Sequence, residues 1–308
     1  MSQKQTPETL LMVRPASFGY NAETAASNAF QKLPKENLIA IQKLALEEFE
    51  NAVRILNNNG IGIIVISDTD SVKPDAIFPN NWISTHVNGL IITYPMLAPN
   101  RRIERRGDVI EELKNRFIVK EVWDISDNEK SNRFLEGTGS IVFDHFNQVA
   151  YACLSPRTNE ELLAELCKKI GYEAIVFHAV DEKNNSIYHT NVMMWVGEMV
   201  AAVCLDAVRS EEDQEKILSK LAETNHKIIA ISYQQMNAFA GNMFEVKNKK
   251  GEAFILMSQT AFQSLLPGQL NEITKYAEPL IIRIDTIETY GGGGIRCMVA
   301  GIYLTEKG

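Results

Sequence analysis

Short apolar runs recur along the chain and are typical of buried β-strands. One run, IGIIVI, covers residues 61–66, and another, GLIITY, covers residues 89–94. Two further runs, at 140–145 and 149–154, are separated by the tripeptide FNQ. Because so few residues join them, these two runs are predicted to form a β-hairpin.

The more polar segments between the runs have apolar residues at helical spacing. Residues 35–58 place apolar side chains three or four positions apart and end at NNNG, which is a helix stop. Residues 158–171 are expected to form a helix capped by Thr158 and ended by Gly171, and residues 210–224 a further helix. The order strand, strand, helix, strand recurs about every 60 residues, which predicts an α/β fold of about five similar units rather than a doubly wound parallel sheet.

Composition and charge exclude several classes of protein. The 308 residues are 45% hydrophobic and 23% charged, and the formal net charge is −8, which argues against a nucleic-acid partner. The densest basic stretch, NRRIERR at 100–106, is short and contains Glu104. No apolar stretch reaches the roughly 20 residues of a membrane span, and the N-terminus has no hydrophobic signal region. No linker rich in proline or serine divides the chain, so a single domain is expected.

The cysteines show neither a metal-binding nor a disulfide pattern. They are scattered at positions 153, 167, 204 and 297. This spacing predicts free thiols in a reducing cytoplasm and argues against a zinc site. The chain also lacks the glycine-rich signatures of dinucleotide and phosphate loops, so no cofactor is expected.

One cysteine, Cys297, has an unusual neighbourhood, because four glycines at 291–294 precede it and an apolar run follows it. A loose turn beside a core cysteine would explain this pattern. A nucleophile that needs backbone room would explain it as well, and such a thiol needs a base nearby. His189, in IYHTNVMMWV, is the candidate base, because an extended chain would place His189 and Asn191 on the same side. Taken alone, such a histidine is more often a surface residue.

Two further stretches combine polar residues with features of a pocket. Glu136 lies in FLEGTGSIVF, where glycines would let a ligand approach a carboxylate, although a polar loop residue is the commoner case. The stretch KPDAIFPNNWISTH, residues 73–86, interleaves amides and a carboxylate with Phe78 and Trp82. This mixture suits a binding pocket with apolar walls, although an asparagine-rich turn would also fit.

Together these stretches resemble the guanidino-group-modifying superfamily, the penteins, over nearly the whole chain. Within it the chain most resembles the amidinotransferase-like group that contains citrulline-utilisation hydrolases. The resemblance is carried, in chain order, by MVRPASFGYNAETAASNAFQ, DAIFPNNWISTH, NRRIERR, LEGTGSIVFD, YHTNVMMWVG and GGGGIRCM. It implies a five-bladed α/β propeller of ββαβ units with pseudo-five-fold symmetry, formed by one catalytic domain over residues 1–308.

The resemblance also implies a catalytic site and a substrate-binding site. Cys297 falls at the nucleophile's position, His189 at that of the acid and base, and Glu136 at that of the carboxylate. Asp75 and Phe78 are implied to lie in the substrate pocket. The α-carboxylate of an amino-acid substrate would need a cation, and Arg102 or Arg105 of NRRIERR is the candidate, although the solvated face of a helix start explains each arginine as well.

Two positions depart from the pattern of the arginine-processing relatives. Where those proteins commonly carry Phe-x-x-Asp and His-x-Asp, this chain has Asn81 after Phe78 and Asn191 after His189. An amide can donate a hydrogen bond to a ureido oxygen, whereas a carboxylate pairs better with a guanidinium cation. Both departures favour citrulline over arginine as the substrate.

We therefore expect a hydrolase that cleaves a C–N bond through a covalent cysteine intermediate and converts citrulline to ornithine, ammonia and carbon dioxide. An arginine-type deiminase or dihydrolase is the alternative, since succinylarginine dihydrolases resemble the Phe-x-x-Asn pattern and use a guanidinium substrate. An amidinotransferase with the same site and a non-catalytic binding protein of the same fold are further alternatives. A zinc amidohydrolase would need a histidine-rich cluster, which the sequence lacks. The expected partner is the small amino-acid substrate, and the sequence leaves a homodimer open.

Overall fold

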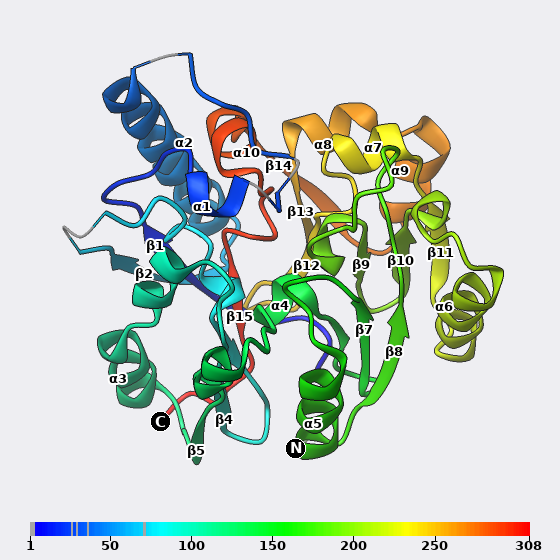
Figure 1. Cartoon of the computed structure of the whole chain (residues 1–308), viewed down its shortest axis with the longest axis horizontal. Coiled ribbons are helices and arrows are strands. Elements are labelled where there is room, and N and C mark those ends of the chain that lie inside the picture. The colour runs from blue at the N-terminus through cyan, green and yellow to red at the C-terminus, as the bar shows by residue number, and fades with distance from the viewer. Residues whose placement is uncertain (1–3, 26, 29, 36, 70–71) are drawn as a thin grey trace.

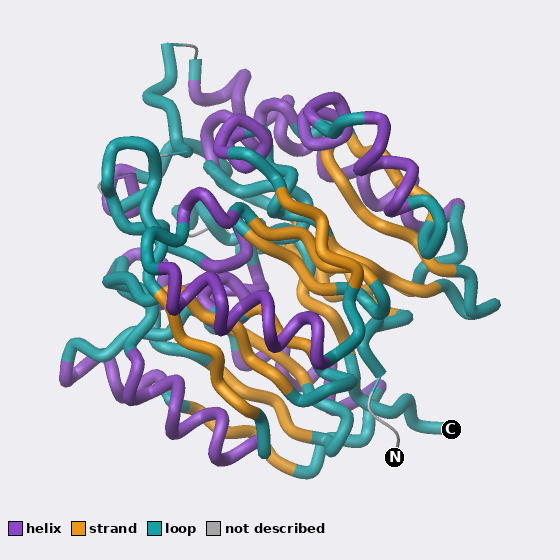
Figure 2. The backbone as a smooth tube through the Cα atoms, turned by 90° about the vertical axis from the view of Figure 1, so that its right-hand side faces the viewer, coloured by secondary structure: helices purple, strands orange, loops and turns teal. Residues whose placement is uncertain are grey.

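The computed structural model describes residues 4–25, 27–28, 30–35, 37–69 and 72–308. Within these residues the strands form five separate three-stranded sheets. The sheets lie around the middle of the molecule, with the longer helices toward its outside (Figures 1 and 2). The five-unit α/β repeat predicted from the sequence is therefore confirmed.

One unit illustrates the plan that all five share. Strands β6 (Val142–Asp144) and β7 (Val149–Cys153) form the predicted antiparallel hairpin. Helix α5 (Glu160–Ile170) then crosses over, so that β8 (Glu173–Phe177) pairs parallel with β7. Each sheet thus has an antiparallel pair and a parallel pair that share the middle strand.

Three other units follow the same order along the chain. They are β3 (Ile83–Thr85), β4 (Leu90–Thr93), α3 (Gly107–Arg116) and β5 (Glu121–Asp124); β9 (Met194–Val196), β10 (Val200–Val203), α6 (Glu211–Glu223) and β11 (Lys227–Ala230); and β12 (Phe244–Lys247), β13 (Ala253–Ser258), α8 (Gln259–Ser264), α9 (Pro267–Ile273) and β14 (Glu278–Ile282).

The remaining sheet joins the two ends of the chain. Its strand β15 (Ala300–Ile302) pairs antiparallel with β1 (Thr9–Arg14), and β1 pairs parallel with β2 (Gly62–Ser67) across helix α2 (Leu38–Asn58). The first strand of this unit therefore comes from the C-terminus. The pairing of β15 with β1 closes the ring of five sheets. It also places the glycine-rich segment before β15 at the position that the segment before the first strand occupies in each of the other units.

Shorter elements connect these strands and helices. The short α-helices are α1 (Ala22–Ala25), α4 (Gly137–Ser140), α7 (Tyr233–Asn237) and α10 (Asp285–Gly291), and the 3₁₀ turns are Pro79–Asn81, Pro99–Glu104, Ser126–Ser131, Thr190–Val192 and Leu205–Ala207. Several of them carry the polar residues singled out in the sequence.

The helix termini partly follow the predicted signals. In α5 the cap is Asn159 rather than Thr158, because the Asn159 side chain accepts a hydrogen bond from the Leu162 N–H at 2.9 Å. Gly171 ends this helix with a left-handed φ of 76°, as expected for a glycine stop. Helix α2 starts at Leu38 with Asn37 as its cap, three residues later than predicted.

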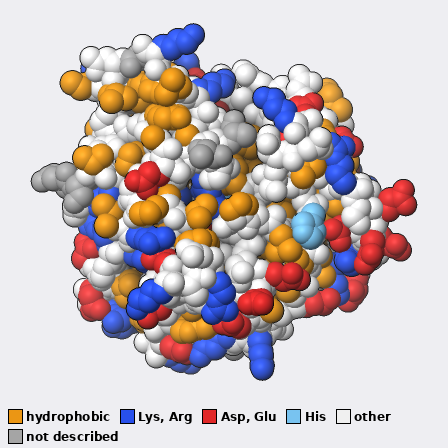
Figure 3. All heavy atoms as spheres, viewed as in Figure 1, with side chains coloured by type: hydrophobic (Ala, Val, Ile, Leu, Met, Phe, Trp, Pro, Cys, Tyr) orange, Lys and Arg blue, Asp and Glu red, His pale blue; other side chains and the backbone are white. Residues whose placement is uncertain are grey.

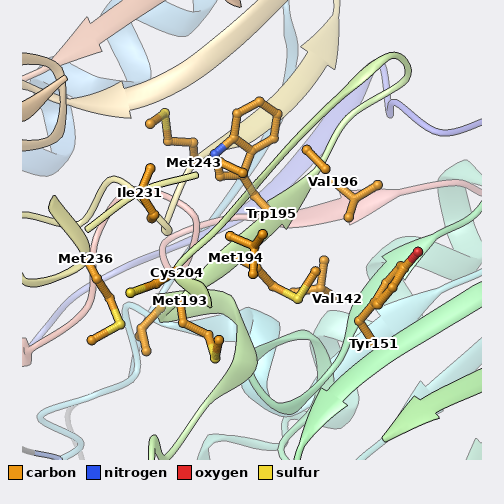
Figure 4. Close-up of a cluster of buried hydrophobic side chains, with 14 of the residues drawn as sticks. Val142, Tyr151, Met193, Met194, Trp195, Val196, Cys204, Ile231, Met236 and Met243 are labelled. Atoms are coloured by element: carbon orange, nitrogen blue, oxygen red, sulfur yellow. The ribbon is translucent and has the colours of Figure 1, made fainter. Parts of the chain in front are cut away.

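Buried apolar clusters hold the sheets together. The cluster in Figure 4 includes Met193, Met194 and Trp195 at β9, with Cys204 and Met243 from the following segments. This packing fixes β9 and the turn that precedes it. Among the described residues, no helix is long and apolar enough to cross a membrane. Basic and acidic side chains are intermixed over the face shown in Figure 3.

Candidate active site

The segments that precede the first strands of the five sheets converge. Asn81 precedes β3, Asn191 precedes β9, Asn242 precedes β12 and Cys297 precedes β15, each by two or three residues. In the remaining unit Gly139 takes the corresponding place before β6. The repeat therefore brings residues that are far apart in the sequence to one place on its axis.

The sulfur of Cys297 lies among asparagine side chains. Nδ2 of Asn191 donates to Sγ at 3.5 Å, and Nδ2 of Asn242 donates to Sγ at 3.4 Å. Nδ2 of Asn242 also donates to the backbone carbonyl of Asn191 at 2.6 Å, which fixes the orientation of that amide. These donors can stabilise negative charge on the sulfur or on an oxygen bound to the carbon it attacks.

His189 and Glu136 form a buried pair. Nε2 of His189 lies 2.8 Å from Oε2 of Glu136, and Glu136 is fully buried. The carboxylate also accepts hydrogen bonds from the Leu97 N–H at 3.0 Å and from Nη1 of Arg157 at 3.3 Å. Glu136 thus orients the imidazole ring and compensates the charge that forms when the ring takes up a proton.

Burial is the largest influence on the pKa of each of these groups. It lowers the pKa of His189 to about 4, although the hydrogen bond to Glu136 acts in the opposite direction. Burial alone would raise the pKa of Glu136, but Arg157 and His189 hold that pKa well below its usual range. Burial raises the pKa of the Cys297 thiol, and the hydrogen bond from Asn242 offsets only part of this rise. At neutral pH the resting site therefore contains a neutral imidazole, an ionised Glu136 and a protonated thiol.

The glycine at position 139 allows two polar groups to approach closely. A Cβ atom built there would lie 2.4 Å from Nδ2 of Asn81 and 2.7 Å from Nδ1 of His189. Oδ1 of Asn81 accepts a hydrogen bond from Nη1 of Arg101 at 2.8 Å, so the amide nitrogen is the end that faces His189. Among the described residues Nδ2 of Asn81 has no hydrogen-bond partner, and His189 uses its Nε2, not its Nδ1, to contact Glu136. Both atoms are available to a ligand.

The four glycines before Cys297 do not form the loose turn that one interpretation of the sequence expected. Helix α10 extends to Gly291, and Gly292 ends it with a left-handed φ of 64°. A Cβ atom at Gly293 would lie 3.0 Å from the Phe78 ring and 3.1 Å from Cβ of Cys297. The glycines therefore let the aromatic ring and the thiol pack against the same stretch of backbone.

The extended segment predicted over His189 and Asn191 is wrong beyond His189. His189 itself is extended, with φ −137° and ψ 137°, but Thr190–Val192 form a 3₁₀ turn. Asn191 nevertheless reaches Cys297, because the turn directs the two side chains to different parts of one site. His189 contacts Glu136, and Asn191 contacts the sulfur.

A small cavity lies beside Cys297. Asp75, Phe78, Asn81 and His189 line it together with Cys297, whereas Asn191 and Glu136 are not among its lining residues. Its volume is about 20 Å³, which is space for roughly one or two water molecules. An amino-acid substrate therefore requires the cavity to open.

Hydrogen bonds attach the N-terminal segment to the wall of this cavity. Side chains of Asn28 and Gln31 donate hydrogen bonds to the carbonyl oxygens of Gly291 and Gly292. Both side chains belong to the N-terminal segment that follows α1. These hydrogen bonds hold that segment against the glycine-rich backbone of the cavity wall.

The structure does not bring Arg102 to this cavity. Its guanidinium donates to the carbonyl oxygens of Met96 and Leu97 and pairs with Glu129 at 3.3 Å. Arg105 also pairs with Glu129, at 2.5 Å. Both candidates for the carboxylate-binding arginine are therefore engaged beside the cavity rather than in its wall.

Two other arginines line the cavity, and the sequence analysis did not single them out. Arg101 pairs with Glu104 at 2.8 Å and lies 3.7 Å from Asp75. Arg157 contacts Glu136 and stacks over the ring of Tyr188 at 5.0 Å. Aligning the five units at their first strands would have revealed Asn242, whereas no local pattern marks Arg101 or Arg157.

One carboxylate oxygen in the cavity wall has no partner within the described ranges of the chain. Oδ2 of Asp75 accepts hydrogen bonds from Asn21 at 2.7 Å and from Thr24 at 3.1 Å. Oδ1 of Asp75 is buried and has no hydrogen-bond partner among the described residues. An unpartnered buried acceptor is costly, so this oxygen is suited to receive a donor from a ligand.

Groups of three or more histidine, cysteine or acidic side chains that could hold a metal ion are absent from the described part of the chain. All four cysteines are free and buried. The residues at hand for chemistry are therefore a thiol, an imidazole–carboxylate pair and several amide donors.

Five ββαβ units around an axial cysteine site define a pentein. The chain belongs to the family described as "N,N dimethylarginine dimethylhydrolase, eukaryotic", whose family model matches residues 14–304. Members of this family are hydrolases that act on carbon–nitrogen bonds other than peptide bonds, and the chain is assigned to that class of enzyme. No curated protein sequence matches the chain significantly.

Solved structures support the same fold. The N-terminal domain of ArgZ, an arginine dihydrolase from cyanobacteria, was solved as a cysteine-to-serine mutant bound to substrate. It matches with a TM-score of 0.73 and 14% identity over 96% of this chain and 97% of that domain. Apo ArgZ matches with a TM-score of 0.75 and 14% identity over 97% of this chain, which spans only 41% of the longer protein. A dimethylarginine dimethylaminohydrolase adduct with S-methyl-L-thiocitrulline has a TM-score of 0.65 and 16% identity over 96% of this chain and 100% of that chain.

Proposed function

We propose that residues 1–308 form one catalytic domain that hydrolyses the ureido group of citrulline to ornithine, ammonia and carbon dioxide. This proposal places the chain with the citrulline-utilisation hydrolases. The observation that carries it is the charge of the cavity wall. Among the described residues that line the cavity there are two guanidinium groups, Arg101 and Arg157, but a single carboxylate, Asp75. Both guanidinium groups are already paired with carboxylates, Arg101 with Glu104 and Arg157 with Glu136, so Asp75 is the one carboxylate of the described lining left for a ligand. A neutral head group needs fewer counter-ions than a cation.

The first chemical step is attack by Cys297 on the ureido carbon. Because both the thiol and the imidazole are neutral at rest, the thiol proton passes to Nδ1 of His189 as the sulfur attacks. Nε2–H of His189 meanwhile donates to Glu136, whose negative charge stabilises the imidazolium that forms. Negative charge that develops on the ureido oxygen is within reach of the amide donors around the sulfur.

The second step expels the amine. His189 gives its proton to the leaving nitrogen, so that ornithine departs as a neutral amine and a carbamoyl group remains on the sulfur. A water molecule then attacks the carbamoyl carbon while Nδ1 of His189 accepts a proton from it. The sulfur leaves, and the released carbamate breaks down to ammonia and carbon dioxide. Overall one water is consumed for each citrulline.

The two asparagines that replace carboxylates contribute to the selectivity for a neutral substrate. Nδ2 of Asn81 is a donor next to His189 that finds no partner in the part of the chain the structure describes, and such a donor matches a ureido oxygen. Asn191 uses its amide nitrogen for the sulfur of Cys297. A carboxylate at either position would instead attract a cationic head group and disfavour the thiolate.

Arginine is the second candidate substrate, and one observation favours it. The free oxygen Oδ1 of Asp75 in the cavity wall could accept a hydrogen bond from a guanidinium group. An arginine dihydrolase would carry out two successive hydrolyses at the same carbon with the same thiol. Against this alternative, Asp75 is the one carboxylate of the described lining left to pair with the cation, because Asn81 and Asn191 stand where the arginine-processing relatives commonly carry carboxylates.

Product analysis tests the proposed function. The purified protein is incubated separately with citrulline, arginine and N,N-dimethylarginine, each labelled with ¹³C at the ureido or guanidino carbon. From citrulline we expect ¹³C-labelled carbon dioxide together with unlabelled ornithine. We expect little turnover of the other two compounds. Labelled citrulline released from arginine, or dimethylamine released from dimethylarginine as the main reaction, would contradict the proposal.

The expected location and partners follow the same reasoning. Four free, buried thiols are compatible with a reducing compartment, so we propose the cytoplasm. The proposed partner is a small amino acid, which binds once the cavity opens, and no cofactor enters the proposed steps.

A further inference from the structure

A second cavity lies on the axis of the repeat, next to the active site. Residues from the first strand of every sheet line it, and these strands are β3, β6, β9, β12 and β15. Its volume is about 30 Å³, enough for roughly two or three water molecules or a small ion of that size. Asn191, which donates to the sulfur of Cys297, also lines this axial cavity. The two sites therefore share a side chain.

Arg296 is the charged residue of the axial cavity. No aspartate or glutamate is among its lining residues, and within the described part of the chain Arg296 contacts a backbone carbonyl and an aromatic ring rather than a carboxylate. Its Nη1 donates to the carbonyl oxygen of Val299 at 2.9 Å, and its guanidinium lies 4.2 Å from the centre of the Phe244 ring. A guanidinium has five N–H donors, so most of them are left for water or an anion.

A second donor points to a ligand in the same cavity. The Trp195 side chain is buried, since only 4% of the residue is exposed, and its Nε1–H has no hydrogen-bond partner among the described residues. Figure 4 shows the indole ring beside Met243. A buried N–H without a partner is costly, and an acceptor in the cavity would satisfy it.

The other titratable groups of the cavity do not compete for an anion or repel it. Nδ1 of His145 bonds the Tyr172 hydroxyl, and burial together with the nearby His86 and Arg296 holds the pKa of His145 well below its usual range. The Tyr303 hydroxyl donates to the carbonyl oxygen of Gln5 at 3.0 Å. At neutral pH the charge in the cavity is therefore that of Arg296.

We propose that the axial cavity binds a small monovalent anion, of the size of chloride, formate or bicarbonate, through Arg296 and Trp195. Oδ1 of Asn191 is a buried acceptor without a partner among the described residues, and it would accept a hydrogen bond from the hydroxyl of bicarbonate. Among these anions bicarbonate alone supplies such a donor, so it is expected to bind most tightly.

Occupancy of this site would affect Cys297, which follows Arg296 in the chain. The positive charge of Arg296 lowers the pKa of the Cys297 thiol and so opposes the effect of burial. An anion on Arg296 would cancel this charge and make the thiolate harder to form. The bound anion therefore slows the reaction of Cys297 with electrophiles.

Anion binding is measured directly on the whole protein. Crystals are soaked in sodium bromide, and we expect an anomalous-scattering peak in the axial cavity within hydrogen-bonding distance of Arg296 and Trp195. In solution, the protein is titrated with chloride, formate or bicarbonate. Sodium gluconate, whose anion is too large for the cavity, keeps the ionic strength constant. The intrinsic tryptophan fluorescence should change in a saturable manner.

Matched variants assign the signal to the site. Arg296→Met is expected to weaken binding at least tenfold, whereas Arg296→Lys, which keeps the charge, should retain most of it. Trp195→Phe removes the N–H and should weaken binding of bromide, measured by anomalous scattering. A cavity without a bromide peak, together with an unsaturable fluorescence change that is the same in Arg296→Met, would overturn the proposal.

The effect on Cys297 is measured without any substrate, so that its outcome is independent of the proposed function. Modification of Cys297 by iodoacetamide, an uncharged reagent, is followed by peptide mass spectrometry at fixed pH and ionic strength. Saturating bicarbonate should slow modification a few-fold in the native protein and in Arg296→Lys, but not in Arg296→Met. Equal rates with and without bicarbonate in the native protein would show that the anion does not act on Cys297.

Discussion

Nε2 of His189 lies 2.8 Å from Oε2 of the fully buried Glu136. This contact assigns the proton of the neutral imidazole to Nε2, because an ionised carboxylate can only accept a hydrogen bond. Nδ1 is then the basic atom, and it lies beside the gap that Gly139 leaves. The pair therefore determines which face of the ring can exchange a proton with a substrate.

Replacement of the nucleophile should separate chemistry from folding. Cys297→Ala is expected to abolish turnover while the far-UV circular dichroism and the unfolding midpoint stay close to those of the native protein. Cys153→Ala is the matched control, since Cys153 is also fully buried but lies in β7. That control should lower the free energy of unfolding by about 1–2 kcal/mol and retain turnover. Normal activity in Cys297→Ala would rule out the proposed role of the thiol.

Loss of the proton-transfer group should reduce the rate constant of the chemical step. His189→Gln keeps a hydrogen-bonding side chain but cannot carry a proton at neutral pH, so kcat is expected to fall roughly 10²-fold or more. His178→Gln serves as the control, because the His178 side chain is 77% exposed, and it should leave kcat unchanged. If His189→Gln lost only a few-fold in kcat, another group would have to move the proton.

The reactivity of the thiol should depend on pH in a defined direction. Burial raises the pKa of Cys297 above its ordinary value of about 8.5, so the fraction of thiolate grows about tenfold per pH unit below that pKa. The rate of alkylation of Cys297 in the free enzyme, at low anion concentration, should therefore rise from pH 6 to pH 8.5 without reaching a plateau. A plateau by pH 7 would instead indicate a preformed thiolate paired with a protonated His189.

A methyl group placed at Gly139 should disturb the site. The added Cβ atom would overlap Nδ2 of Asn81 and Nδ1 of His189, because the distances are only 2.4 Å and 2.7 Å. Gly139→Ala is therefore expected to lower kcat/KM roughly tenfold or more through displacement of both groups. Gly268→Ala in α9 is the control, since nothing lies within 4 Å of its Cβ position, and it should preserve kcat/KM. Equal kinetics for the two variants would contradict the close approach at Gly139.

The architecture of the fold was accessible from the sequence because each unit repeats the same local signals. The apolar runs at 61–66 and 89–94 correspond to β2 and β4, and the FNQ tripeptide does join an antiparallel hairpin. The sequence could not show that β15 from the C-terminus completes the sheet of β1. That pairing depends on closure of the ring, which no local pattern records.

Part of the candidate active site could be predicted from the sequence because of the same repeat. The motifs around Glu136, His189 and Cys297 each stand before the first strand of a unit, so their convergence follows from the repeat. The arginines are different, because neighbours in NRRIERR point in different directions from a 3₁₀ turn. Of the arginines in that stretch, Arg101 alone lines the cavity. Which arginine side chain of the turn faces the cavity depends on tertiary packing, which the sequence does not show.

Substrate preference tests the central claim most directly. The ratio of kcat/KM for citrulline to that for arginine is measured in the native protein and in the double variant Asn81→Asp, Asn191→Asp. Loss of a partner to a buried charge costs on the order of 3–5 kcal/mol, so we expect the native protein to prefer citrulline strongly and the double variant to shift toward arginine. A native protein that prefers arginine would contradict the account, and a citrulline preference that survives in the double variant would show that the two amides are not its cause.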